Sequence, residues 1–175
     1  ESETKEVEVV KANAPEEVTG MTAIMFNEPN GESMGSTIKL GQAGFDTNIW
    51  YDYGHKKWAN TMTEDGSMWV WIPRYAYKIT YDNPNDKSQG GTIDVKFLEG
   101  TTDNYYDESG NLKQAKRVTS ATETVDTTSD FYVHPAFTNE SSINYANGGW
   151  DKELTGIWVA RLVAGYASGD NNAAV

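Results

Sequence analysis

Few residues of this chain have the types and spacing that catalysis requires. The two histidines, His55 and His134, fall in a predicted turn and directly before a proline, and no Gly-x-Ser-x-Gly segment supplies a strained nucleophile. The chain has no cysteine, which excludes thiolate metal sites, thiol nucleophiles and disulfides. We therefore expect a protein that is not an enzyme and holds no cofactor, and in which His134 makes a structural hydrogen bond.

Calcium is the one cofactor for which suitable ligands occur together. Two loops gather carboxylate and amide oxygens: Asp82, Asn85 and Asp86 in the first, and Asp103, Asp107 and Glu108 in the second. Neither spacing matches the twelve-residue calcium loop of the helix-loop-helix motif, and the same residue types are ordinary in turns. We favour turn chemistry and keep a weak calcium site at the first loop as the alternative.

The charge of the chain excludes one large class of partner. Its formal net charge is −12 and its pI is about 4.5, whereas nucleic-acid binding requires clustered lysine and arginine. The sequence contains no signal peptide, membrane-spanning run or lipidation motif, starts without Met and stops inside a segment that reads as continuing structure. Together with its abundance of Thr, Asn, Gly, Tyr and Trp, this predicts a fragment of an exported, extracellular protein.

Aromatic side chains are the most distinctive feature, at 12% of the residues. Trp50, Tyr51, Tyr53 and Trp58 flank a glycine-containing turn, which predicts a hairpin with Trp50 and Trp58 facing each other. Exposed rings of this kind can stack on the apolar side of a sugar, so these four are the candidate ligand-stacking residues. Core filling is the alternative that we favour for the aromatic residues in general.

The densest aromatic segment, residues 68–81, predicts one continuous strand. Trp69, Trp71, Tyr75 and Tyr77 share one face by the period of two, and Val70 faces the other way with its neighbour at position 72. Because both faces are apolar, this strand is expected to be central and covered on both sides. A second strand over residues 92–98 follows a turn-rich loop.

The whole pattern predicts a mainly β fold. Further strands are expected over residues 21–26, 36–40, 131–137 and 156–163, separated by Gly, Asn and Asp turns, and no long amphipathic helix pattern occurs. We predict β-sandwich-like antiparallel sheets with long loops and an extended N-terminal arm. Residues 1–19 form that acidic arm or strand, and residues 20–175 form a β-rich domain in which the long loop region near 99–130 marks any division.

The N-terminal arm carries its own pattern. Val7 and Val9 alternate with Glu6 and Glu8, which is typical of a half-buried strand. Val7, Val9 and Val10 are therefore the candidate assembly residues, which would add as a strand to the sheet edge of a neighbouring subunit. An acidic tether is the alternative.

Several segments together resemble a known family. They are residues 50–53 (Trp-Tyr-Asp-Tyr), 57–60 (Lys-Trp-Ala-Asn), 69–79 (Trp-Val-Trp-Ile-Pro-Arg-Tyr-Ala-Tyr-Lys-Ile), 133–138 (Val-His-Pro-Ala-Phe-Thr) and 154–161 (Leu-Thr-Gly-Ile-Trp-Val-Ala-Arg). The set resembles large surface and prophage-encoded proteins of Firmicutes and related gut bacteria, some with a prepilin-type N-terminus and some similar to virion fibre components. The resemblance covers roughly residues 20–165.

The resemblance implies a role at a surface and does not imply any catalytic activity. In that family a region similar to the C-type-lectin and formylglycine-enzyme fold usually follows the last segment, whereas Leu162 and Val163 replace the usual aromatic-acidic pair here. No ligand site of that region is carried over. We expect a non-enzymatic structural subunit of an extracellular assembly, a pilus-like filament or a phage fibre, located at the bacterial cell surface or on a virion. Its partners are copies of itself, with surface glycans as partners in the alternative, a carbohydrate-binding or host-attachment module.

Overall fold

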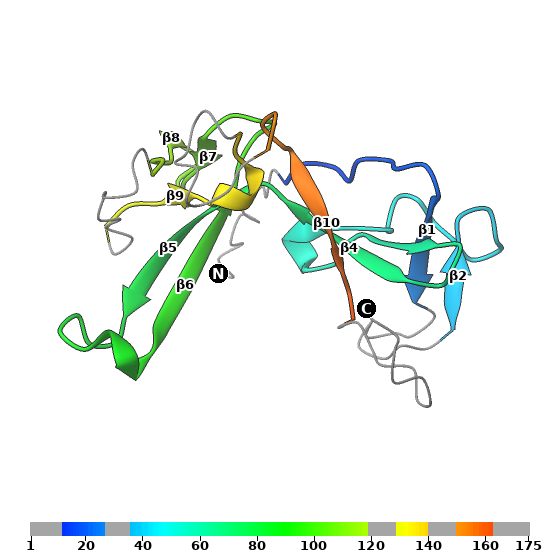
Figure 1. Cartoon of the computed structure of the whole chain (residues 1–175), viewed down its shortest axis with the longest axis horizontal. Helices are drawn as coiled ribbons and strands as arrows, with labels where there is room; N and C mark the ends of the chain where they lie inside the picture. Colours follow the sequence, from blue (N-terminus) through cyan, green and yellow to red (C-terminus); the bar gives the residue numbers. More distant parts are fainter. Residues whose placement is uncertain (1–11, 27–35, 119–128, 140–149, 163–175) are drawn as a thin grey trace, which may run out of the picture. The chain divides into compact units, whose positions relative to one another are not determined.

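The computed structural model describes residues 12–26, 36–118, 129–139 and 150–162 (Figure 1). These residues form antiparallel sheets of short strands, and the helices among them are three 3-10 turns of three residues each. The prediction of a mainly β fold with antiparallel sheets is therefore confirmed. No helix within the described ranges has both the length and the apolar character needed to cross a bilayer.

The strand bounds follow the predicted segments closely in several places. The strands are β1 (Met21–Phe26), β2 (Thr37–Lys39), β3 (Asn60–Thr63), β4 (Met68–Pro73), β5 (Tyr75–Tyr81), β6 (Gly91–Phe97), β7 (Asn104–Tyr106), β8 (Leu112–Gln114), β9 (Tyr132–Val133) and β10 (Gly156–Ala160). The 3-10 helices are η1 (Tyr53–His55), η2 (Lys87–Gln89) and η3 (Pro135–Phe137).

The chain divides into two compact units that do not follow sequence order. The first unit contains residues 1–16, 53–56 and 72–157, and the second contains 17–52, 57–71 and 158–175. The chain passes between them within β4 and again within β10. The loop region near 99–130, which the sequence marked as the point of any division, lies inside the first unit.

The second unit is built on the strands of a five-stranded sheet with the order β10-β4-β3-β1-β2. Its core contains Ile24, Ala59 and Trp71, and the ring of Trp158 packs edge-on against Trp71 with centroids 5.3 Å apart. The β3–β4 turn is closed by Asp65, whose carboxylate accepts hydrogen bonds from the neighbouring threonine and serine. Short polar turns of this kind bring successive strands together as antiparallel neighbours.

The aromatic segment 68–81 is not the single strand that its pattern predicted. Arg74 interrupts it, so that β4 belongs to the five-stranded sheet and β5 to a three-stranded sheet with the order β6-β5-β9. The Arg74 N–H donates to the carbonyl of Thr155 at 2.8 Å, and its own carbonyl accepts from Leu98 at 3.0 Å. The prediction that Trp69 and Tyr75 share a face of one strand is therefore wrong.

The first unit has a small core between its three-stranded sheet and the two-stranded β7–β8 sheet. Ala76, Leu98, Ala115 and Val133 are buried there, with Tyr105 and Phe131 partly buried against them. Tyr132 and Phe137 are also buried in this unit, so its apolar core combines small aliphatic side chains with aromatic ones.

Arg74 adds a buried polar centre to this unit. Its side chain has 0% exposure, and its guanidinium forms ion pairs with Asp103 at 2.9 Å and with Glu153 at 2.8 Å. It also donates to the backbone carbonyls of Thr102 and Phe137. A single side chain thus joins segments that are widely separated in sequence, and the described structure leaves no buried side-chain polar atom without a partner.

Arg117 completes the cluster by binding the same two carboxylates. It pairs with Asp103 at 2.6 Å and with Glu153 at 2.8 Å, so two arginines face two acids. Burial opposes ionisation of both acids, but the hydrogen bonds and charges of Arg117 and Arg74 outweigh it and lower the pKa of Asp103. The pKa of Glu153 is lowered by the same balance, with a further hydrogen bond from the backbone of Asn139. The cluster is therefore charged and balanced at neutral pH.

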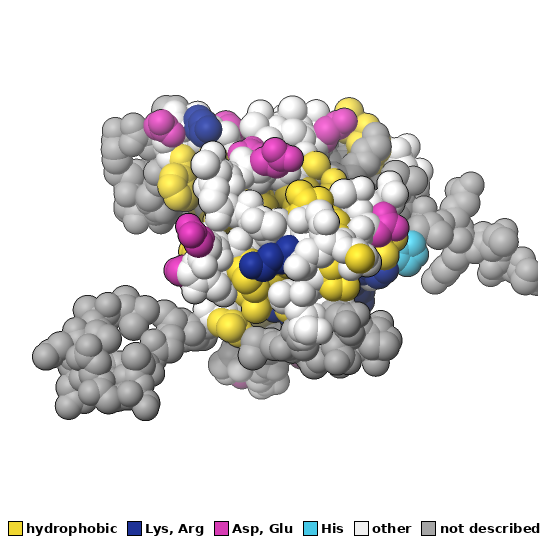
Figure 2. Space-filling view, turned by 90° about the vertical axis from the view of Figure 1, so that its right-hand side faces the viewer, with side chains coloured by type: hydrophobic (Ala, Val, Ile, Leu, Met, Phe, Trp, Pro, Cys, Tyr) yellow, Lys and Arg dark blue, Asp and Glu magenta, His cyan; other side chains and the backbone are white. Residues whose placement is uncertain are grey.

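Surface charge is dispersed on the side of the molecule drawn in Figure 2. Acidic side chains lie among uncharged ones there, and basic side chains are few. The acidic excess is therefore not gathered into one patch on that face.

Replacing Arg74 should destabilise the first unit strongly. Arg74→Met removes the charge while retaining a long apolar side chain, and breaking a buried ion pair by removing one partner costs about 3–5 kcal/mol. Urea unfolding followed by circular dichroism measures this cost. The control is Lys116→Met, which removes an exposed ion pair with Asp130 and should cost under about 1 kcal/mol. Equal effects of the two variants would contradict the assignment of Arg74 as the centre of the unit.

Acid should weaken the first unit through the same carboxylates. The ordinary pKa values are 3.8 for Asp103 and 4.5 for Glu153, and both are lowered by folding. The stability that they contribute is therefore complete above these ordinary values and is lost as the pH falls through the lower pKa values of the folded state. We expect the melting temperature to fall below pH 4.5, and to fall less steeply in Arg117→Met, which lacks the main cause of the shifts. An equally steep fall of the melting temperature in the natural protein and in Arg117→Met would contradict this.

Candidate functional site

The β5–β6 hairpin is the most prominent surface feature of the first unit (Figure 1). Its ladder runs from the Tyr75–Phe97 pair to the Tyr81–Gly91 pair. Residues directly opposite in an antiparallel ladder lie on the same face, so the hairpin has two faces of different chemistry. One face pairs aromatic and aliphatic residues, and the other pairs charged and small polar residues.

The apolar face is covered at its base and open toward its tip. At the base, Tyr75 packs on Phe137 and His134, with ring centroids 5.2 and 5.1 Å away, and Tyr53 packs on Phe97. Toward the tip, Ile93 is 65% exposed and Val95 is 46% exposed. This face therefore presents apolar side chains that no described part of the chain covers fully.

The outer edge of β6 is open as well. The strand order places β6 at the end of its sheet, and no other strand in the described ranges pairs with it there. Its first five residues, 91–95, are all exposed. An exposed edge presents backbone N–H and C=O groups that can pair with an added strand.

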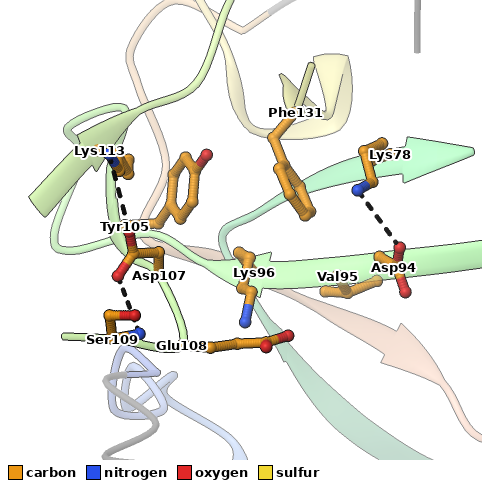
Figure 3. A pocket seen from close by; sticks show the side chains of 10 residues that line it. All are labelled: Lys78, Asp94, Val95, Lys96, Tyr105, Asp107, Glu108, Ser109, Lys113 and Phe131. Atoms are coloured by element: carbon orange, nitrogen blue, oxygen red, sulfur yellow. Dashed lines mark hydrogen bonds and ion pairs between the residues drawn. The ribbon is translucent and has the colours of Figure 1, made fainter. Parts of the chain in front are cut away.

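The opposite face of the hairpin forms the floor of an open cleft of about 380 Å³ (Figure 3). The β7–β8 hairpin and Phe131, the residue before β9, provide the rest of its lining. The lining residues are Lys78, Asp94, Val95, Lys96, Tyr105, Asp107, Glu108, Ser109, Lys113 and Phe131. Three lysines and three carboxylates therefore surround two aromatic rings, and their charges balance.

Two long ion pairs cross the lining of this cleft. Lys78 lies 3.7 Å from Asp94, and Lys113 lies 3.7 Å from Asp107. The Lys78 ammonium also lies over the ring of Phe131, 5.2 Å from its centroid. Asp107 is oriented by its own turn, where hydrogen bonds led by the Asn111 backbone N–H lower its pKa.

The predicted ligand-stacking residues do not form one described platform. Trp50, Tyr51 and Trp58 belong to the second unit, whereas Tyr53 belongs to the first and packs on Phe97. The predicted hairpin is reduced to a short reversal around η1, closed by the bridge between residues 52 and 57. Trp50 packs on Phe45 and Tyr51, and its indole N–H donates to the Asn60 carbonyl at 3.0 Å. Trp58 remains 41% exposed.

The predicted calcium ligands lie in the loop at the tip of the β5–β6 hairpin. Asp86 caps η2 there, because its carboxylate accepts from the N–H and hydroxyl of Ser88 and from the Gln89 amide. These bonds, led by the Ser88 hydroxyl, lower the pKa of Asp86. Asp82 is exposed beside Gly90, and Asn85 is an exposed turn residue. Within the described ranges no group of three acidic or histidine side chains is placed to hold a metal ion.

His134 has the structural role that its position before a proline predicted. Its Nδ1 accepts a hydrogen bond from the Ala136 N–H at 3.2 Å and caps η3. Burial lowers the pKa of His134, which favours the neutral imidazole that such an acceptor requires. His55 lies at the exposed end of η1.

The candidate assembly residues Val7, Val9 and Val10 lie outside the described residues. The following segment is described and is attached to the first unit through Asn13. The Asn13 amide donates to the carbonyls of Gly100 and Thr155 and accepts from the Gly100 N–H, each at 2.8 Å. Glu16 accepts a hydrogen bond from the Thr155 hydroxyl.

Sequence reasoning missed both surfaces of the β5–β6 hairpin and the Arg74 cluster. The alternation of residues 91–97 carried the only local signal, since isoleucine, valine and phenylalanine occupy every second position. Tyr105 and Phe131 lie 26 positions apart and gave no such signal. Comparison with family models, curated proteins and solved structures finds no match to this chain. The resemblance to surface and prophage proteins therefore stays a prediction.

Calcium should not change the melting temperature of the protein if the acidic residues of the loop serve only to form its turn. The oxygens of Asp86 already accept three hydrogen bonds from side-chain and backbone donors, so calcium has to displace them. We expect equal melting temperatures in millimolar calcium and in a chelator, measured by differential scanning calorimetry. A higher melting temperature in calcium that Asp86→Asn abolishes would establish the metal site instead.

Proposed function

We propose that this protein is a non-enzymatic structural subunit of an extracellular assembly, a pilus-like filament or a phage fibre. The observation that carries the proposal is the exposed edge of β6 with Ile93 and Val95 beside it. An apolar, unpaired strand edge is a hazard for a protein that works alone, and natural proteins usually cover or charge it. In an assembly the same edge is an acceptor for a strand from another subunit.

The N-terminal arm has the composition of a matching donor strand. Val7 and Val9 are two residues apart, as Ile93 and Val95 are. An added strand would place both valines on the apolar face of the hairpin, extending its cross-strand pairs.

Attachment at Asn13 supports the same proposal. The hydrogen bonds of Asn13 with Gly100 and Thr155 hold the second half of the arm to the first unit. Residues 1–11 span at most about 40 Å when extended, which is enough to reach a neighbouring subunit. Because each subunit carries a net charge of −12, association requires a contact of this specific kind to offset the mutual repulsion.

The alternative, a carbohydrate-binding or host-attachment module that uses Trp50, Tyr51, Tyr53 and Trp58, has less support. Trp50 and Tyr53 are packed against neighbouring rings, which leaves less of their surface for a sugar.

Cysteine cross-linking tests the strand addition directly, because the natural chain has no cysteine to interfere. An antiparallel arm brings Val9 beside Ile93, and a parallel arm brings it beside Val95. Val9→Cys is mixed with Ile93→Cys or with Val95→Cys under oxidising conditions. We expect one of the two mixtures to form a disulfide-linked heterodimer, resolved by non-reducing electrophoresis and mass spectrometry.

The matched control for this experiment is Asp94→Cys, which lies between the two acceptor positions but on the other face of β6. It should give little heterodimer with Val9→Cys. Equal linking of all three positions, or linking of none, contradicts the proposal. So does an exclusively intramolecular disulfide in the double variant V9C/I93C, because it would assign the arm to its own subunit.

A further inference from the structure

The cleft on the polar face of the β5–β6 hairpin is a second surface, which shares Val95 with the proposed assembly contact. We propose that it binds a neutral saccharide, which would attach the assembled subunit to a glycan. The site consists of the aromatic rings of Tyr105 and Phe131 and the charged side chains around them (Figure 3). It is distinct from the Trp50–Trp58 region in which the sequence predicted stacking.

The two rings supply the apolar part of the site. Their centroids are 5.1 Å apart with planes tilted by 49°, and both rings are anchored at one side against the core of the unit. Partial burial fixes their orientation before a ligand arrives, which lowers the entropic cost of binding. Burial, followed by the nearby Asp107 charge, raises the pKa of Tyr105, so the phenol keeps its proton and can donate a hydrogen bond.

The charged lining selects the class of ligand. The three carboxylates repel phosphate, sulfate and nucleic acid, and the three lysines repel a metal cation. An aliphatic ligand would take the water away from these charged groups and offer no hydrogen bond in its place. A sugar hydroxyl both donates and accepts, so a saccharide can satisfy the carboxylates and the lysines together while its C–H face lies on a ring.

A saccharide can replace the ion pairs in the lining with hydrogen bonds of its own. Both are 3.7 Å long, and three of their four side chains are 30% exposed or more. Exposed pairs of this kind contribute little to stability, so exchanging them for hydrogen bonds to hydroxyl groups costs little. The volume of about 380 Å³ lies at the small end of ligand sites, which suits a short saccharide.

Binding of the full chain to an array of neutral, amino and acidic glycans tests the proposal. We expect signal on neutral glycans, followed by titration of the strongest free oligosaccharide by calorimetry. Tyr105→Leu and Asp94→Asn should each weaken binding at least tenfold. Tyr105→Leu keeps an apolar side chain against the core, and its circular dichroism melt shows whether the fold is intact. Asp94→Asn alters an exposed side chain and tests the site even if the first variant unfolds.

Two control variants separate this site from the other surfaces. Trp58→Leu should bind normally, and loss of binding there would move the site to the predicted aromatic region and overturn the proposal. Ile93→Asp should block strand addition without affecting glycan binding, so the two functions can fail independently. Absence of signal on the array, signal confined to acidic glycans, or displacement of the oligosaccharide by a synthetic peptide of residues 1–11 would each overturn the saccharide assignment.

Discussion

The first unit depends on one buried cation. Arg74 occupies the break between β4 and β5, where its backbone bonds to Thr155 and Leu98 and its side chain binds Asp103 and Glu153. A guanidinium with 0% exposure is tolerable only when carboxylates and carbonyls surround it, so the segments that carry these groups must converge at this point. This polar convergence, together with the apolar core, holds the loops of the unit in place.

The β5–β6 hairpin shows how this constraint positions the two surfaces for which we propose a function. The hairpin begins one residue after Arg74, and the Arg74 carbonyl accepts the hydrogen bond of Leu98 just after β6 ends. The base of the hairpin is therefore fixed, while its tip extends past the residues that cover the base. One face then offers apolar side chains and an open edge, and the other offers a charge-balanced cleft. The proposed assembly contact and the proposed glycan contact can share this element because a strand directs alternate side chains to opposite faces.

Much of the secondary structure was predictable, since it follows from local alternation and turn residues. β1 coincides with the predicted segment 21–26, and β6 lies within one residue of the predicted 92–98. The mainly β class followed from the same signals. The site was less predictable: Tyr53 was predicted to stack on a ligand but packs on Phe97, and Tyr105 had no local pattern to mark it. Local alternation reports burial within one strand and carries no information on which strands meet.

The sequence alone determined that this chain is acidic, free of cysteine, rich in aromatic residues and built of short strands, because each of these properties is local or compositional. Only the tertiary structure decided that the segment 68–81 breaks at Arg74, that Asp103 and Glu153 converge on it, and that Tyr105 meets Phe131. The physical reason is that a buried charge is neutralised by groups remote in sequence, whose approach depends on the closing of every loop between them.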